Sequence, residues 1–145
     1  MMLSKHFSLE QMVASTTAQR KGIDNTPDPA TIERLRYLCS ILDVIHEDIA
    51  PIIVTSGYRS PKLNRAVGGQ RKSQHMLGEA ADIEVATTAS AIRTSKELWL
   101  AIRVHRILYD QLILEFGRWV HLSFSDKPRH MALIIDKAGT RPLWG

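Results

Sequence analysis

The order of the hydrophobic patterns is the feature that most restricts the fold of this chain. From Asp28 to Ile45, apolar residues recur at the spacing of one helix face. Short β-branched segments gather in the second half, where segments 111–116 and 119–123 are separated only by a glycine and an arginine, which is typical of a β-hairpin. Helices that precede clustered, hairpin-linked strands favour an α+β fold, with an antiparallel sheet and helices packed on one side, over a doubly wound α/β fold.

The remaining elements follow from capping residues and from alternation of apolar and polar residues. Ser8 can cap a first helix, with Gln11 completing a capping box. Pro61, just after Ser60, suits the first turn of a later helix. The tail 136–145 carries no clear pattern. The other expected elements are a loop over 16–26, a strand over 51–56, a short helix over 60–68, a loop over 70–79, a strand over 81–85, a helix over 90–107 and a strand over 130–135.

Composition restricts the classes of function. The 145 residues, of which 44% are hydrophobic and 23% charged, suit a single domain over 1–145, and we expect a monomer. No apolar run reaches the length of a signal peptide or a membrane span, so we expect synthesis in the cytoplasm without a signal peptide and no membrane insertion. The net charge of +4 is spread along the chain, so no nucleic-acid partner is expected. The single cysteine, Cys39, lies in an apolar run and is expected to be a small buried side chain.

His75 and Asp82 form the first part of a candidate metal site. His75 lies in the expected loop and Asp82 on the strand that follows it. Gly78 lets the intervening chain turn sharply, because glycine adopts backbone angles that other residues avoid. The imidazole nitrogen and the carboxylate oxygen can then converge on one ion.

A catalytic zinc commonly has three protein ligands and a fourth position for water, so a third ligand is needed. His121 is the best candidate, because it lies on a strand between apolar Val120 and Leu122. The other histidines lie near a terminus or at element boundaries and are expected to be solvated or locally bonded. Spacing alone leaves an alternative open, in which a loop histidine lies beside an aspartate that caps a turn.

Residues 73–82, of the form Ser-x-His-x-x-Gly-x-Ala-x-Asp, are followed by Trp-Val-His at 119–121. Together these motifs resemble the zinc D-Ala-D-Ala carboxypeptidase family, peptidase family M15. Residues 56–60, Ser-Gly-Tyr-Arg-Ser, resemble the arginine segment of that family, and the start at Phe7 resembles its subgroup of small, often phage-encoded members. The resemblance runs from about residue 6 to about residue 124.

The resemblance implies the fold shared by these peptidases and the hedgehog signalling domain, one bound Zn²⁺, and hydrolysis of peptidoglycan peptide bonds. Family members include D,D-carboxypeptidases, D,D-endopeptidases and L-alanyl-D-glutamate endopeptidases. A phage-type endolysin or virion-associated hydrolase, acting on the cell wall after release, is therefore expected. The site residues so implied are His75, Asp82 and His121 for the metal, Arg59 for catalysis and substrate binding, and Ser73, Gln74 and Trp119 for substrate binding.

The chain departs from the family pattern at Arg118. Many members carry the catalytic carboxylate three residues before the last histidine ligand, where Arg118 stands here and cannot act as a base. Glu115 lies on the preceding strand and faces the same side as His121 if the hairpin turn is tight, so we assign it as the general base, with Glu79 and Glu84 as weaker alternatives. If no carboxylate reaches the site, the chain is a catalytically inactive zinc-containing module that binds the cell wall.

Overall fold

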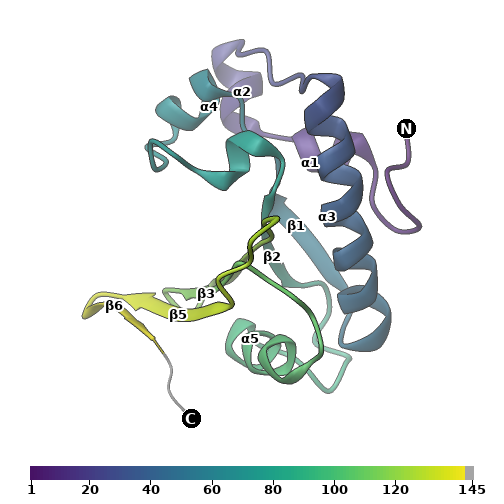
Figure 1. Cartoon of the computed structure of the whole chain (residues 1–145), viewed down its shortest axis with the longest axis vertical. Coiled ribbons are helices and arrows are strands. Elements are labelled where there is room, and N and C mark those ends of the chain that lie inside the picture. Colours follow the sequence, from purple (N-terminus) through teal and green to yellow (C-terminus); the bar gives the residue numbers. More distant parts are fainter. Residues whose placement is uncertain (143–145) are drawn as a thin grey trace.

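A six-stranded sheet forms the centre of the computed structural model, which describes residues 1–142 (Figure 1). The strand order is β1-β2-β4-β3-β5-β6. Neighbouring strands are antiparallel except β3 and β5, which run parallel. The strands are β1 (Ile52–Ser56), β2 (Ala80–Val85), β3 (Gln111–Glu115), β4 (Trp119–Ser123), β5 (Met131–Asp136) and β6 (Gly139–Pro142).

The parallel pair arises from the connection between β4 and β5. β4 and β5 lie on opposite sides of β3, so segment 124–130 must pass the start of β3 before β5 begins. The predicted α+β class is confirmed, with this one pair running parallel in a mostly antiparallel sheet. The crossover places Asp110, just before β3, next to Arg129, just before β5.

The long helix α3 (Pro29–Asp48) forms where the amphipathic pattern predicts it. The Asp28 side chain accepts a hydrogen bond from the Thr31 backbone N–H at 2.8 Å, and Pro29 occupies the first turn. One face of the helix is fully buried and consists of Leu35, Leu38, Cys39, Leu42 and Ile45. The other helices that precede β2 are α1 (Leu9–Val13), α2 (Thr16–Lys21), α4 (Pro61–Ala66) and the 3₁₀ helix η1 (Gln74–Leu77).

Helix α2 (Thr16–Lys21) corrects the expectation of a loop over 16–26. Ser15 caps its start by accepting a hydrogen bond from the Ala18 backbone N–H at 3.1 Å. Gly22 ends it in the left-handed conformation. Ala18 is the one buried residue of this polar helix, so no apolar period announces it in the sequence.

Helix α5 (Ser95–Val104) is shorter than the predicted 90–107. Thr94 is the N-cap of this helix, and the backbone is already extended at His105. Apolar residues before Thr94 and after His105 therefore do not belong to the helix. Trp99 anchors the helix to the sheet, because the side chain is buried and donates a hydrogen bond to the Leu112 carbonyl at 3.0 Å.

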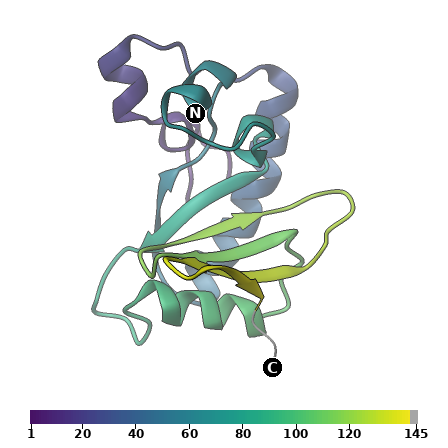
Figure 2. The same ribbon diagram turned by 90° about the vertical axis from the view of Figure 1, so that its left-hand side faces the viewer.

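The two faces of the sheet have different surroundings. One face packs against α3 and α5, which lie beside the strands in both views (Figures 1 and 2), while α1, α2 and α4 gather at one end of the molecule. The apolar residues of β2, β3 and β4 point to the helices, and the alternate residues point away from them. The core-facing residues of these three strands are Ala81, Ile83, Leu112, Leu114, Val120 and Leu122.

No helix within residues 1–142 has the length and apolar character needed to cross a bilayer.

Candidate metal centre

His75 is buried on η1, and local hydrogen bonds fix its orientation. Ser73 caps η1 by accepting a hydrogen bond from the His75 backbone N–H at 3.2 Å, and Gly78 ends it at a φ of 73°. The His75 Nδ1 lies 2.7 Å from the Gly57 carbonyl oxygen. Because a carbonyl only accepts, Nδ1 carries the proton and Nε2 is the nitrogen left to bind a metal.

Asp82 and His121 complete a three-residue cluster. They are direct partners in the pairing of β2 with β4, and Asp82 Oδ1 lies 3.0 Å from His121 Nδ1. The same oxygen lies 3.4 Å from His75 Nε2. One ligand atom from each of the three residues lies within 4.8 Å of the others. The structure therefore brings together the three metal ligands that the sequence resemblance implied.

The electrostatics of the cluster favour a cation. Burial alone would raise the pKa of Asp82, but hydrogen bonds and charges from His121 and His75 outweigh it and hold the pKa well below its usual range. Asp82 is therefore a carboxylate at neutral pH, enclosed with two imidazoles. Two imidazole nitrogens and one carboxylate oxygen, with room for a further ligand, are a donor set that suits Zn²⁺.

A cleft of about 410 Å³ opens beside this cluster. His121 and Glu115 both line it, as do Ser73 and Gln74 from the loop that carries His75. Residues of β3 and β5 also line the cleft, and Thr140 of β6 contributes to its lining. The predicted substrate residues Ser73 and Gln74 thus lie in the same cleft as His121, one of the candidate metal ligands.

Glu115 is the carboxylate that the fold places in the cleft. Its register partner is Trp119, two residues before His121 on β4, so Glu115 and His121 face the same side of the hairpin. Burial raises the pKa of Glu115, and the negative charge of Asp82 adds to this. Neither Glu79 nor Glu84, the weaker alternatives, lines the cleft.

The backbone around Arg59 is held by side-chain hydrogen bonds. Asn25 accepts a hydrogen bond from the Ser60 backbone N–H at 2.7 Å and donates one to the Tyr58 carbonyl at 3.0 Å. The Arg59 backbone N–H donates to the His75 carbonyl at 3.1 Å. The arginine segment and η1 are therefore tied to each other.

The Arg59 guanidinium is partly buried near the candidate metal centre. Burial lowers its pKa, while the negative charges of Asp82 and Glu115 oppose that effect. Its Nε atom is buried and has no hydrogen-bond partner among the described residues. A buried donor without an acceptor is costly, so this N–H is suited to donate a hydrogen bond to an incoming anion or carbonyl oxygen. Arg59 does not line the cleft that contains Glu115 but a neighbouring one beside α2 and α4.

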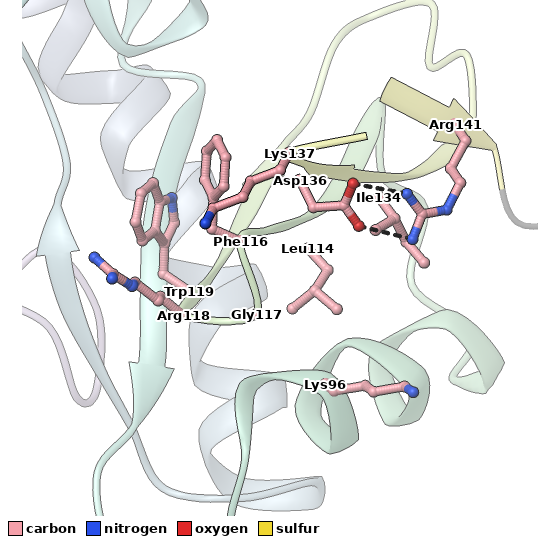
Figure 3. Close-up of a pocket in the computed structure, with 10 residues that line it drawn as sticks. All are labelled: Lys96, Leu114, Phe116, Gly117, Arg118, Trp119, Ile134, Asp136, Lys137 and Arg141. Atoms are coloured by element: carbon pink, nitrogen blue, oxygen red, sulfur yellow. Dashed lines mark hydrogen bonds and ion pairs between the residues drawn. The ribbon is translucent and has the colours of Figure 1, made fainter. Parts of the chain in front are cut away.

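Trp119 lies at the tip of the hairpin, in a separate hollow of about 560 Å³. Figure 3 shows its ring beside that of Phe116, with Lys137 close by and Asp136 paired with Arg141. The ring centroids of Trp119 and Phe116 are 6.3 Å apart. Its predicted role as a wall of the substrate cleft therefore stays a prediction, since the ring lines this neighbouring hollow.

Asp110 and Arg129 are not among the site residues predicted from the sequence. Asp110, just before β3, is buried, and Arg129, just before β5, lines the cleft. The two form an ion pair with Nη2 and Oδ2 2.8 Å apart. A charged residue directly before an apolar strand was the available signal for Asp110, while the position of Arg129 depends on the parallel crossover.

A cluster of two histidines and one aspartate, beside a carboxylate in an open cleft, is typical of the active sites of metal-dependent hydrolases. A family model described as Peptidase M15 matches residues 5–123. The chain belongs to the peptidase M15 family, a family of metallopeptidases, which assigns it peptidase activity and a peptide substrate. Comparison with curated proteins gave no match.

Proposed function

We propose that the chain is a zinc-dependent peptidase that hydrolyses peptide bonds of bacterial peptidoglycan. The observation that carries this proposal is the convergence of His75, Asp82 and His121 beside Glu115 at one cleft. Membership in the M15 family supports it independently. The bond cut is a D,D bond, as for a carboxypeptidase or endopeptidase, or the bond between L-alanine and D-glutamate.

The proposed mechanism assigns a role to each residue near the scissile bond. Zn²⁺, which His75, Asp82 and His121 would hold, would supply a Lewis acid for the scissile carbonyl and for the attacking water. Glu115 accepts a proton from the attacking water and passes it to the leaving amine, for which its raised pKa is suited. Arg59 supplies a fixed positive charge for the developing oxyanion or for a substrate carboxylate.

The proposed setting follows from the substrate. A peptidase of peptidoglycan acts at the cell wall, so we propose a phage-type endolysin or a virion-associated hydrolase that works as a monomer after its release. Substrate contacts come from Ser73 and Gln74 in the cleft and from Trp119 in the separate hollow at the hairpin tip.

Digestion of purified peptidoglycan tests the proposal. The zinc-loaded protein should release peptide fragments that mass spectrometry identifies, and these fragments name the bond. Glu115→Gln should retain zinc and release far less product. If the zinc-loaded wild type releases no fragments, the peptidase proposal for this substrate fails.

A catalytically inactive zinc-containing module that binds the cell wall is the second candidate. Arg118 favours it, because this residue stands where many family members carry the catalytic carboxylate. Co-sedimentation of the zinc-loaded protein with intact peptidoglycan, without release of fragments, would support this candidate. Cleavage that depends on Glu115 would exclude it.

A further inference from the structure

Asp110 joins three segments that border the cleft. Its Oδ1 accepts hydrogen bonds from the Arg129 backbone N–H at 2.8 Å and from Arg129 Nε at 2.9 Å. Its Oδ2 accepts from Arg129 Nη2 at 2.8 Å and from Gln74 Nε2 at 3.0 Å. Asp110 is only 2% exposed, and the Arg129 hydrogen bond, with burial opposing it, lowers its pKa. Asp110 is therefore a buried carboxylate whose acceptors are all used to hold Arg129 and Gln74.

This pairing leaves one edge of the guanidinium unused. Arg129 meets Asp110 through Nε and Nη2, which form one side of the planar fork. The two Nη1 hydrogens and the outer Nη2 hydrogen donate to no residue within 1–142, and the Arg129 side chain is 55% exposed. Two parallel N–H groups on a fixed plane match the two oxygens of a carboxylate.

Arg129 lines the cleft that also contains His121 and Glu115. Lys72 lines the same cleft, from the loop before His75. The charge of Arg129 is offset by Asp110, and Lys72 adds a positive charge that has no ion-pair partner within residues 1–142. Arg59, which lines a different hollow, is not part of this group.

We propose that Arg129 and Lys72 form an anion subsite that binds a carboxylate of the peptide substrate, with Asp110 as the positioning residue of Arg129. The subsite rests on the proposed function and deepens it, because it selects peptides that carry a free carboxylate near the scissile bond. An amidated peptide offers one neutral oxygen and places an NH₂ group against the cations. Such a peptide therefore binds less tightly at this subsite.

The test compares two synthetic peptides made of L-Ala, γ-linked D-Glu, L-Lys and two D-Ala residues. One carries free carboxylates and the other carries amides at the same positions. Steady-state cleavage by the zinc-loaded wild type should show a KM about tenfold higher for the amidated peptide, the effect of about 1.4 kcal/mol, with kcat nearly unchanged. Isothermal titration of the same peptides into zinc-loaded Glu115→Gln should show the same ratio of Kd values.

Arg129→Gln should lose most of this discrimination, with the KM for the free peptide rising towards that for the amidated one, while Lys72 retains the remainder. Arg129→Lys should recover part of it, because the charge remains but the fork is lost. Lys127→Gln, which removes an exposed cation outside the cleft, is the matched control and should discriminate as the wild type does. Melting temperature and zinc content, measured for each variant, separate loss of the subsite from loss of the fold.

Cleavage of both peptides with equal KM by the wild type would overturn the subsite while leaving the peptidase intact. Discrimination retained in full by a folded Arg129→Gln protein would overturn the assignment to Arg129. If the wild type neither binds nor cleaves either peptide or peptidoglycan, the proposed function fails and the subsite fails with it.

Discussion

Asp82 and His121 face each other directly across β2 and β4, with 3.0 Å between Oδ1 and Nδ1. Their chain neighbours Ile83 and Val120 are also register partners, and both are fully buried on the helix-covered face. Because side chains alternate along a strand, a slip of one residue would move the carboxylate into the core. Hydrophobic burial on one face of the sheet thus fixes the ligand geometry on the other.

Removal of the Asp82 carboxylate should abolish stable metal binding. Asp82→Asn leaves two imidazoles and a neutral amide, so zinc affinity should fall by more than about 100-fold, beyond the usual effect of an outer-shell change. Competition with a fluorescent chelator measures this affinity. Asp48→Asn, at the exposed end of α3, is the control and should bind zinc as the wild type does. Unchanged zinc affinity in Asp82→Asn would show that the metal is held elsewhere.

Glu115→Gln should reduce turnover without loss of metal. A general base contributes about 10²–10⁴-fold to a rate, so kcat should fall by that factor while KM changes little. Glu84→Gln and Glu79→Gln serve as controls, because neither residue lines the cleft. A larger loss in either control than in Glu115→Gln would reassign the base.

The raised pKa of Glu115 predicts a pH-dependent stability difference in the metal-free protein. Burial, with the charge of Asp82, makes the carboxyl bind its proton more tightly when folded than when unfolded. The stabilisation that results is complete below the unfolded pKa and is lost as pH rises through the folded pKa. Glutamine stays neutral, so metal-free Glu115→Gln should melt higher than metal-free wild type at about pH 7 and equally at about pH 4. A difference that does not change between these pH values would contradict the shift.

Gly57→Ala should weaken both the fold and the metal centre. A Cβ at position 57 would overlap the Met12 carbonyl oxygen, so the backbone must move, at a cost of about 1–3 kcal/mol in the free energy of unfolding. The Gly57 carbonyl also holds His75, so zinc affinity should fall by about 10–100-fold. Urea denaturation and chelator competition measure the two effects. Gly22→Ala, where a Cβ meets open space at a positive φ, should lose about 1 kcal/mol of stability and no zinc affinity.

The candidate ligands could be predicted from the sequence because the motifs that carry the family resemblance contain them, whereas spacing alone left an alternative open. His75, Gly78 and Asp82 lie within one short motif, and the φ of 73° at Gly78 agrees with the sharp turn that was expected there. The alternation of residues along a tight hairpin was enough to place Glu115 and His121 on one face. Burial raises the pKa of the Cys39 thiol to about 12, in agreement with its expected structural role.

What the sequence could not supply depends on contacts between distant segments. The apolar pattern over 130–135 predicts a strand, but it does not say that the strand runs parallel to β3. The meeting of Asp110 with Arg129 follows from that pairing and was therefore missed. Helix α2 was missed for a local reason, since its caps are present but only Ala18 is buried.

The sheet order has a consequence for the opening of the cleft. β2 and β4, which carry Asp82 and His121, are inner strands, whereas β6 is bonded only to β5 at the sheet edge and is exposed along its length. Amide hydrogens over 139–142 should therefore exchange with solvent quickly, and those over 81–83 slowly. Local unfolding of this edge would widen the cleft while the three ligands stay in place. Admission of a bulky, branched polymer would then cost only the free energy of fraying one strand.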